Sequence, residues 1–103
     1  MLNNRERRPT HPGEILREDI LPAININQTE LAKTMGVSRR TISEIIHERR
    51  PVSPDIAHRL AKVFHTSPEF WLNLQQAVDI WDQLQTHQQV YDNIKPIDKT
   101  KAA

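Results

Sequence analysis

The stretch "QTELAKTMGVSRRTISEIIH", residues 28–47, contains two short helical patterns separated by a glycine. Apolar residues recur at helical spacing on both sides of it: Leu31, Ala32 and Met35 before the glycine, Ile42, Ile45 and Ile46 after it. Gly36 can adopt the left-handed geometry that ends a helix tightly. Two helices joined by a three-residue turn with a glycine form a helix-turn-helix, so the stretch predicts that motif.

Two adjacent arginines, Arg39 and Arg40, open the second helix of this motif. Positive side chains in the first turn lie beside the positive end of the helix dipole, which is unfavourable. With Ile42 pointing inward, the opposite face carries Arg40, Ser43, Glu44 and His47. This polar face suggests that an external anion supplies the missing negative charge. The alternative is a solvated face, with the arginines paired to Glu44 or Glu48.

Helix start signals punctuate the rest of the chain. Asn27 with Glu30 resembles a capping box, and serine precedes a helix start at Ser38, Ser53 and Ser67. An earlier start lies in "THPGEIL", and Pro22 is expected to end or kink that helix. With no credible strand pair, the chain is predicted to be all-α, with five helices. Its expected organisation is a flexible arm over 1–10, a helix-turn-helix domain with a C-terminal dimerisation helix over 11–86, and a flexible tail over 87–103.

The composition is that of a small globular domain: 103 residues, 37% hydrophobic and 26% charged. The absence of cysteine and of a long apolar run fits a cytoplasmic protein without a membrane span. Charge is distributed unevenly, with a net +3 over residues 1–66, −4 over 67–94 and +2 over 95–103. A basic front and an acidic rear predict two surfaces with different partners.

The stretch 28–47 resembles the helix-turn-helix of phage repressors and of the xenobiotic-response-element regulators, a lambda-repressor-like fold. The matching positions are Leu31, Ala32, Met35, Gly36, Val37, Ile42 and Ile45. This resemblance implies that the second helix enters the major groove of operator DNA and reads bases through Arg39, Arg40, Ser43 and Glu44. Paired arginines favour a guanine-containing half-site, and Glu44 either accepts from a cytosine amino group or only orients Arg40. The expected backbone contacts are Gln28, Thr29, Ser38, Thr41, Arg49 and Arg50, although "HERR" can also be an ordinary charged loop.

A second pattern, "SPEFWLNLQQAVDIWDQL", covers residues 67–84. Its apolar stripe is wide for one neighbouring helix, and tryptophan is favoured at interfaces. Packing on the chain's own core is the alternative, and part of the stripe is expected to do so. The residues assigned to homodimerisation are Phe70, Trp71, Leu74, Val78, Trp81 and Leu84.

"HPGEIL", the helix-turn-helix and "SPEFWLNLQQAVDIW" together resemble the HigA antitoxins, or VapI group, over about residues 11–84. The resemblance implies an antitoxin that neutralises a HigB-type toxin, an mRNA endonuclease, and represses the shared operon, acting in the bacterial cytoplasm at the nucleoid. A stand-alone repressor without a toxin is the alternative. Because both chain ends are short, toxin neutralisation is expected to use the folded helical surface.

Nothing in the sequence favours an enzyme. The five histidines, His11, His47, His58, His65 and His87, are scattered without carboxylates or cysteines at metal-ligand spacing. Two glycines in total leave no phosphate-binding loop, and no Ser/His/Asp arrangement is evident. We therefore expect neither a metal nor a cofactor.

Overall fold

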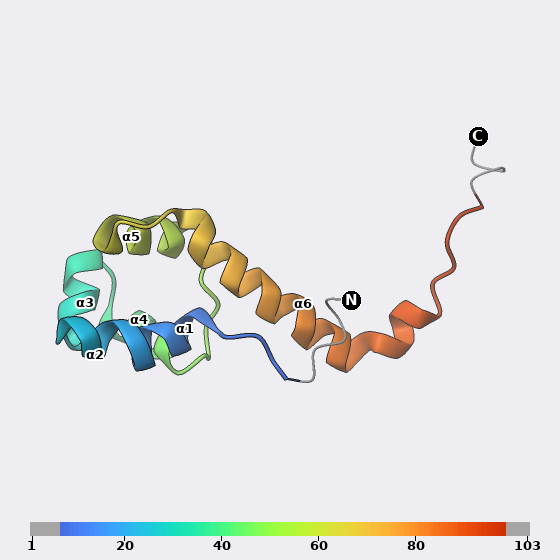
Figure 1. Cartoon of the computed structure of the whole chain (residues 1–103), viewed down its shortest axis with the longest axis horizontal. Helices are drawn as coiled ribbons and strands as arrows, with labels where there is room; N and C mark the ends of the chain where they lie inside the picture. The colour runs from blue at the N-terminus through green and yellow to red at the C-terminus, as the bar shows by residue number, and fades with distance from the viewer. Residues whose placement is uncertain (1–6, 99–103) are drawn as a thin grey trace.

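The computed structural model describes residues 7–98, and this part of the chain is entirely helical apart from its connections (Figure 1). Helices α1, η2 and α2 follow one another without a break and form one helical segment. The elements are α1 (Pro12–Ile15), η2 (Leu16–Ile20), α2 (Leu21–Ile24), α3 (Gln28–Met35), α4 (Arg39–Ile46), α5 (Pro54–Phe64) and α6 (Pro68–Asp92). The five helical segments of the described residues confirm the all-α prediction.

The first segment passes through Pro22 instead of ending there. Its middle turn, η2, is a π-helical turn in which the Leu21 N–H bonds to the Leu16 carbonyl. Because proline has no N–H and its ring crowds the preceding turn, a wide turn directly before it relieves both problems. The segment ends instead at Asn25, whose φ of 56° is left-handed.

The predicted helix caps are present. Asn27 and Glu30 form both bonds of a capping box, at 2.8 Å and 3.1 Å. The hydroxyls of Ser38, Ser53 and Ser67 each accept a backbone N–H three residues on. Each such bond satisfies one donor that the first helical turn leaves unpaired, which fixes where α4, α5 and α6 begin.

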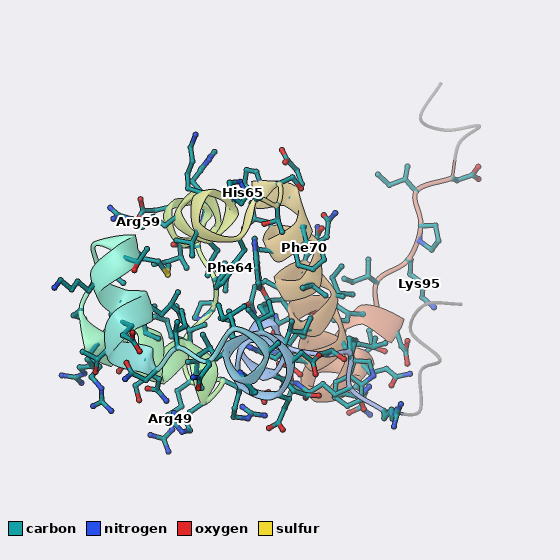
Figure 2. All side chains as sticks on the ribbon, turned by 60° about the vertical axis from the view of Figure 1, so that its left-hand side comes forward. Arg49, Arg59, Phe64, His65, Phe70 and Lys95 are labelled. Atoms are coloured by element: carbon teal, nitrogen blue, oxygen red, sulfur yellow. The ribbon has the colours of Figure 1, made fainter. Side chains whose placement is uncertain are left out.

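One hydrophobic core joins the first segment, the helix-turn-helix, α5 and the start of α6. Its largest side chains with less than 2% exposure include Leu16, Leu31, Ile42, Ile45, Leu60 and Trp71. Each contributes about 2 kcal/mol by leaving water. Phe64 of α5 points towards α6 and lies 6.1 Å from the Trp71 ring (Figure 2). The core therefore fixes α3 and α4 relative to the rest of the chain.

Helix α6 runs from the core out beyond the other helices (Figure 1). It bends at His87, whose φ of −128° and ψ of 17° are not helical, and it continues to Asp92. Residues 87–92 of the predicted tail are therefore helical. No helix among residues 7–98 is both long and apolar enough to cross a membrane.

Candidate nucleic-acid interface

A side chain of a third helix, α5, binds the turn between α3 and α4. Gly36 has a φ of 71°, as the motif requires, and its neighbour Ala32 is 3% exposed where the helices cross. Arg59 of α5 donates through Nη1 to the Met35 carbonyl at 2.7 Å, and through Nε to Asp55 at 3.0 Å. The last carbonyls of α3 thus face a positive charge, which stabilises the negative end of the helix. No local pattern in the sequence predicts this contact, which spans 24 residues.

The first turn of α4 carries its polar side chains outward from a well-capped start. The Ser38 hydroxyl accepts the Thr41 N–H at 3.1 Å and lies 2.9 Å from the Thr41 hydroxyl. Arg39 is exposed, and the Arg40 side chain is 85% exposed. Both arginines are therefore available to a ligand that approaches the N-terminal half of α4.

Glu44 links the exposed polar face of α4 to the following loop. Its carboxylate accepts from Arg50 Nη2 at 2.7 Å and Nε at 2.9 Å, and from Arg40 Nε at 3.3 Å. These bonds, above all the one from Arg50, lower the pKa of the Glu44 carboxyl. Two arginines therefore share one carboxylate, and Glu44 joins Arg40 of α4 to Arg50 of the loop.

The other predicted contacts differ in exposure. Thr29, Arg49 and Arg50 are exposed, whereas Gln28, Thr41 and Ser43 are half-buried. Arg49 extends away from α5, on which Arg59 lies (Figure 2). The predicted contacts thus come from the start of α3, from α4 and from the loop after α4. Among them, the structure joins Arg40, Glu44 and Arg50 directly, and it also joins Ser38 to Thr41.

A buried glutamine holds the loop that carries Arg49 and Arg50. Gln75 of α6 is 6% exposed, and its Oε1 accepts the N–H of buried Val52 at 2.9 Å. Its Nε2 donates to Asp79 at 2.9 Å, which fixes the orientation of the amide. The contact spans 23 residues, and no local pattern in the sequence predicted it.

The "HPG" start of the first segment packs directly on the end of α4. A Cβ on Gly13 would lie 1.9 Å from the Ile45 carbonyl oxygen, so only glycine allows this approach. The Gly13 N–H donates to Nδ1 of His11, which caps the helix at 2.9 Å. His11 is 3% exposed, and this burial lowers the pKa of its imidazole.

The apolar stripe of α6 divides into an inner and an outer set. Trp71 and Val78 are 0% and 1% exposed, and the Trp71 indole donates to Thr66 at 2.8 Å. These two side chains lie in the core of their own chain and leave no surface for a second copy, which corrects their assignment to the dimer contact. Phe70 is 43% exposed, and Leu74, Trp81 and Leu84 are half-buried.

Beyond the core, this outer set continues into a groove of about 450 Å³ lined by Asp79, Ile80, Gln83, Leu84 and Tyr91. Ile80 is 57% exposed there.

Within residues 7–98, no three side chains of the metal-binding types come together.

Comparisons with known proteins identify the family of this chain. A family model described as helix-turn-helix matches residues 16–71. An uncharacterized HTH-type transcriptional regulator of Haemophilus influenzae is 42% identical over 92 residues, covering 87% of this chain and 86% of that protein. Antitoxin HigA-1 of Vibrio cholerae is 39% identical over 92 residues, covering 89% and 87%. The solved structure of Pseudomonas aeruginosa antitoxin HigA with the higBA promoter has a TM-score of 0.83 at 38% identity, covering 88% of this chain and all of that one. The chain therefore belongs to the helix-turn-helix family of transcriptional regulators, in the group that includes the HigA antitoxins.

Proposed function

We propose that this protein is the antitoxin of a toxin–antitoxin pair, which represses its own operon by binding operator DNA and neutralises a HigB-type toxin. The observation that carries the DNA-binding part is the exposed arginine face of α4, in a chain similar to an antitoxin solved with promoter DNA. The toxin-binding part rests on the similarity to HigA-1.

In this proposal α4 lies in the major groove. Arg39 and Arg40 read base edges, and arginine bound to guanine N7 and O6 is worth about 1–3 kcal/mol of discrimination. Glu44 orients Arg40 and Arg50 through its two ion pairs. Arg49 and Arg50 contact phosphates, which adds affinity without sequence preference and makes binding depend on salt.

Homodimerisation matches the two-fold symmetry of an operator. The surface proposed for it is the outer set of α6, in which Phe70 is exposed and Leu74, Trp81 and Leu84 are half-buried. Exposed Ile80 in the adjoining groove extends this surface. Two reading helices in one dimer then meet half-sites about 34 Å apart, one turn of DNA.

The toxin is proposed to bind folded helical surface on the faces away from Arg39 and Arg40. Residues 67–94 carry four acidic and no basic side chains, which suits a basic, RNA-cleaving partner. The exposed side of the first helical segment is the second surface available. With the toxin on these surfaces, the reading face of α4 stays free for DNA.

The DNA-binding part is tested by fluorescence anisotropy with the upstream region of the gene. Arg40→Ala is expected to weaken binding by about tenfold or more and to relax specificity at one base pair. Lys62→Ala removes the same charge from an exposed position of α5 and serves as the control. Equal binding by the Arg40 variant and the wild type would refute the assigned reading face.

The toxin-binding part is tested by co-expression with the adjacent gene. Restored growth and co-purification of the two proteins support an antitoxin. A neighbouring product that is harmless and does not co-purify supports the stand-alone repressor instead.

A further inference from the structure

One residue of the segment before α1, Arg8, joins two distant parts of the chain. Its guanidinium binds Asp82 of α6 with both carboxylate oxygens, Nε to Oδ1 at 2.8 Å and Nη2 to Oδ2 at 2.9 Å. Its remaining nitrogen, Nη1, donates to Glu48 at 2.9 Å. Residues 7–11 lead from α1 towards the outer part of α6 (Figure 1). A two-pronged arginine–carboxylate pair fixes orientation as well as distance.

Glu48, the second partner of Arg8, lies between the reading helix and the basic loop. Its φ of 61° is left-handed, a conformation that a non-glycine residue keeps only when its surroundings hold it. Arg17 also reaches Glu48, at 3.4 Å, and donates to the Ile46 carbonyl at the end of α4. Arg49 and Arg50 follow Glu48 directly in the chain, so its position sets where they leave the helix.

We propose that Arg8 is a positioning residue for DNA binding, which clips the loop carrying Arg49 and Arg50 to α6 through Glu48 and Asp82. This inference rests on the proposed operator binding and deepens it. Arg8 acts through the loop and need not touch DNA. Through this clip Asp82, an acidic residue of α6, is expected to raise the affinity for a polyanion.

The clip predicts that removing the Asp82 charge lowers the affinity for DNA, whereas charge alone predicts that it raises the affinity. Removing a negative charge from a DNA-binding protein strengthens its attraction to phosphates. If Asp82 anchors the clip, Asp82→Asn instead weakens binding, because Arg8 loses its two-pronged partner and the loop loses its support. Arg8→Ala also weakens binding, because it removes the other partner of the same ion pair.

The experiment measures operator affinity by anisotropy at several salt concentrations for Arg8→Ala, Asp82→Asn and the double variant. Each single variant is expected to weaken binding about fivefold, the largest effect typical of an exposed ion pair. The double variant should be no weaker than either single one, because both remove the same link. The slope of log affinity against log salt should fall by about 1 as one phosphate contact is lost.

Two control variants separate positioning from charge. Arg7→Ala removes the same charge from the neighbouring residue and is expected to reduce affinity less than Arg8→Ala. Glu69→Gln removes an acid from the exposed start of α6 and should leave affinity unchanged or slightly raised. Circular dichroism and urea unfolding establish the folded fraction of each variant, and a changed salt slope reports on contacts independently of that fraction.

Arg8→Lys keeps the charge but not the two-pronged geometry, and is expected to restore only part of the affinity. Operator binding by Asp82→Asn as tight as the wild type or tighter, with an unchanged salt slope, would overturn the clip. If Arg40→Ala still weakens binding in that case, the proposed function stands and only the clip fails. If Arg40→Ala has no effect, the proposed reading face fails.

Discussion

Gly13→Ala is expected to destabilise the protein because the first helical segment touches the backbone of α4 at this residue. The added Cβ would lie 1.9 Å from the Ile45 oxygen and 2.9 Å from the Ile45 carbonyl carbon. Both are backbone atoms, so no change of rotamer relieves the collision. The first segment and α4 must move apart, and the core between them, including Leu16, must adjust.

Two opposing effects set the magnitude. Alanine favours a helix over glycine by about 1 kcal/mol, which would stabilise the variant. Overpacking a tight contact, with the backbone shifts that it forces, costs about 1–3 kcal/mol and occasionally more. Since this contact is far below the van der Waals distance, we expect a net loss of about 2 kcal/mol. With a urea slope of about 2 kcal/mol per M, the unfolding midpoint falls by about 1 M.

Urea unfolding followed by circular dichroism measures this loss, and the second glycine provides the matched control. Gly36 has a φ of 71°, and its added Cβ would meet only the flexible end of Arg59, at 3.2 Å. Its requirement is conformational, so Gly36→Asn should be tolerated well, because asparagine adopts left-handed geometry readily. Gly13→Asn should be at least as damaging as Gly13→Ala. A Gly13→Ala protein as stable as the wild type would refute the packing argument.

Three further perturbations test other parts of the chain. Gln75→Leu leaves the buried Val52 N–H unpaired and should cost about 1–3 kcal/mol by urea unfolding, and a loss no greater than that of exposed Gln76→Leu would contradict this. Burial lowers the pKa of His11, so the stability it contributes is complete above its unfolded pKa of about 6.5 and is lost as pH falls through the folded pKa. His11→Asn keeps an acceptor for the helix cap and should flatten that decline, whereas an unchanged pH dependence of the urea midpoint would exclude His11 as its source. Trp81→Glu should give a monomer with unchanged helical content, and light scattering that still shows a dimer would remove this surface from the interface.

The local features of the fold were predictable because each depends on residues close together in the chain. A serine before a helix start accepts an N–H three residues on, as Ser38 and Ser67 do. Gly36 supplies the left-handed turn of the motif by itself. The π-turn before Pro22 was not predicted, because a proline signals an interrupted helix without specifying whether the helix ends, bends or widens.

The supports of the candidate site were not predictable, because their partners are far apart in sequence. Arg8 meets Asp82 across 74 residues, and Gln75 meets Val52 across 23. Charge and polarity show that such residues can pair, and only the packed helices decide with which partner. Within the arm assigned to residues 1–10, Arg8 forms two ion pairs, and residues 1–6 lie outside the described part of the chain.

The apolar stripe of α6 contains both buried and exposed residues. Periodicity identifies an apolar face, but it does not separate the part that packs inward from the part that stays outside. Phe70 and Trp71 are neighbours of the same residue class, yet one is 43% exposed and the other is fully buried. Their rings meet edge to face at 5.1 Å, so the outer aromatic extends the core rather than forming a separate cluster.

Glu44 explains how α4 can begin with two adjacent arginines. A helix that begins with two cations bears an electrostatic cost, and the carboxylate one turn on offsets part of it by pairing with Arg40. That same carboxylate also holds Arg50, so three charged groups share one position with a net charge of +1. A lone carboxylate on this face would repel a polyanion, whereas one paired with two arginines leaves the face cationic. Arg40 stays 85% exposed in this arrangement, as its proposed contact with a base edge requires.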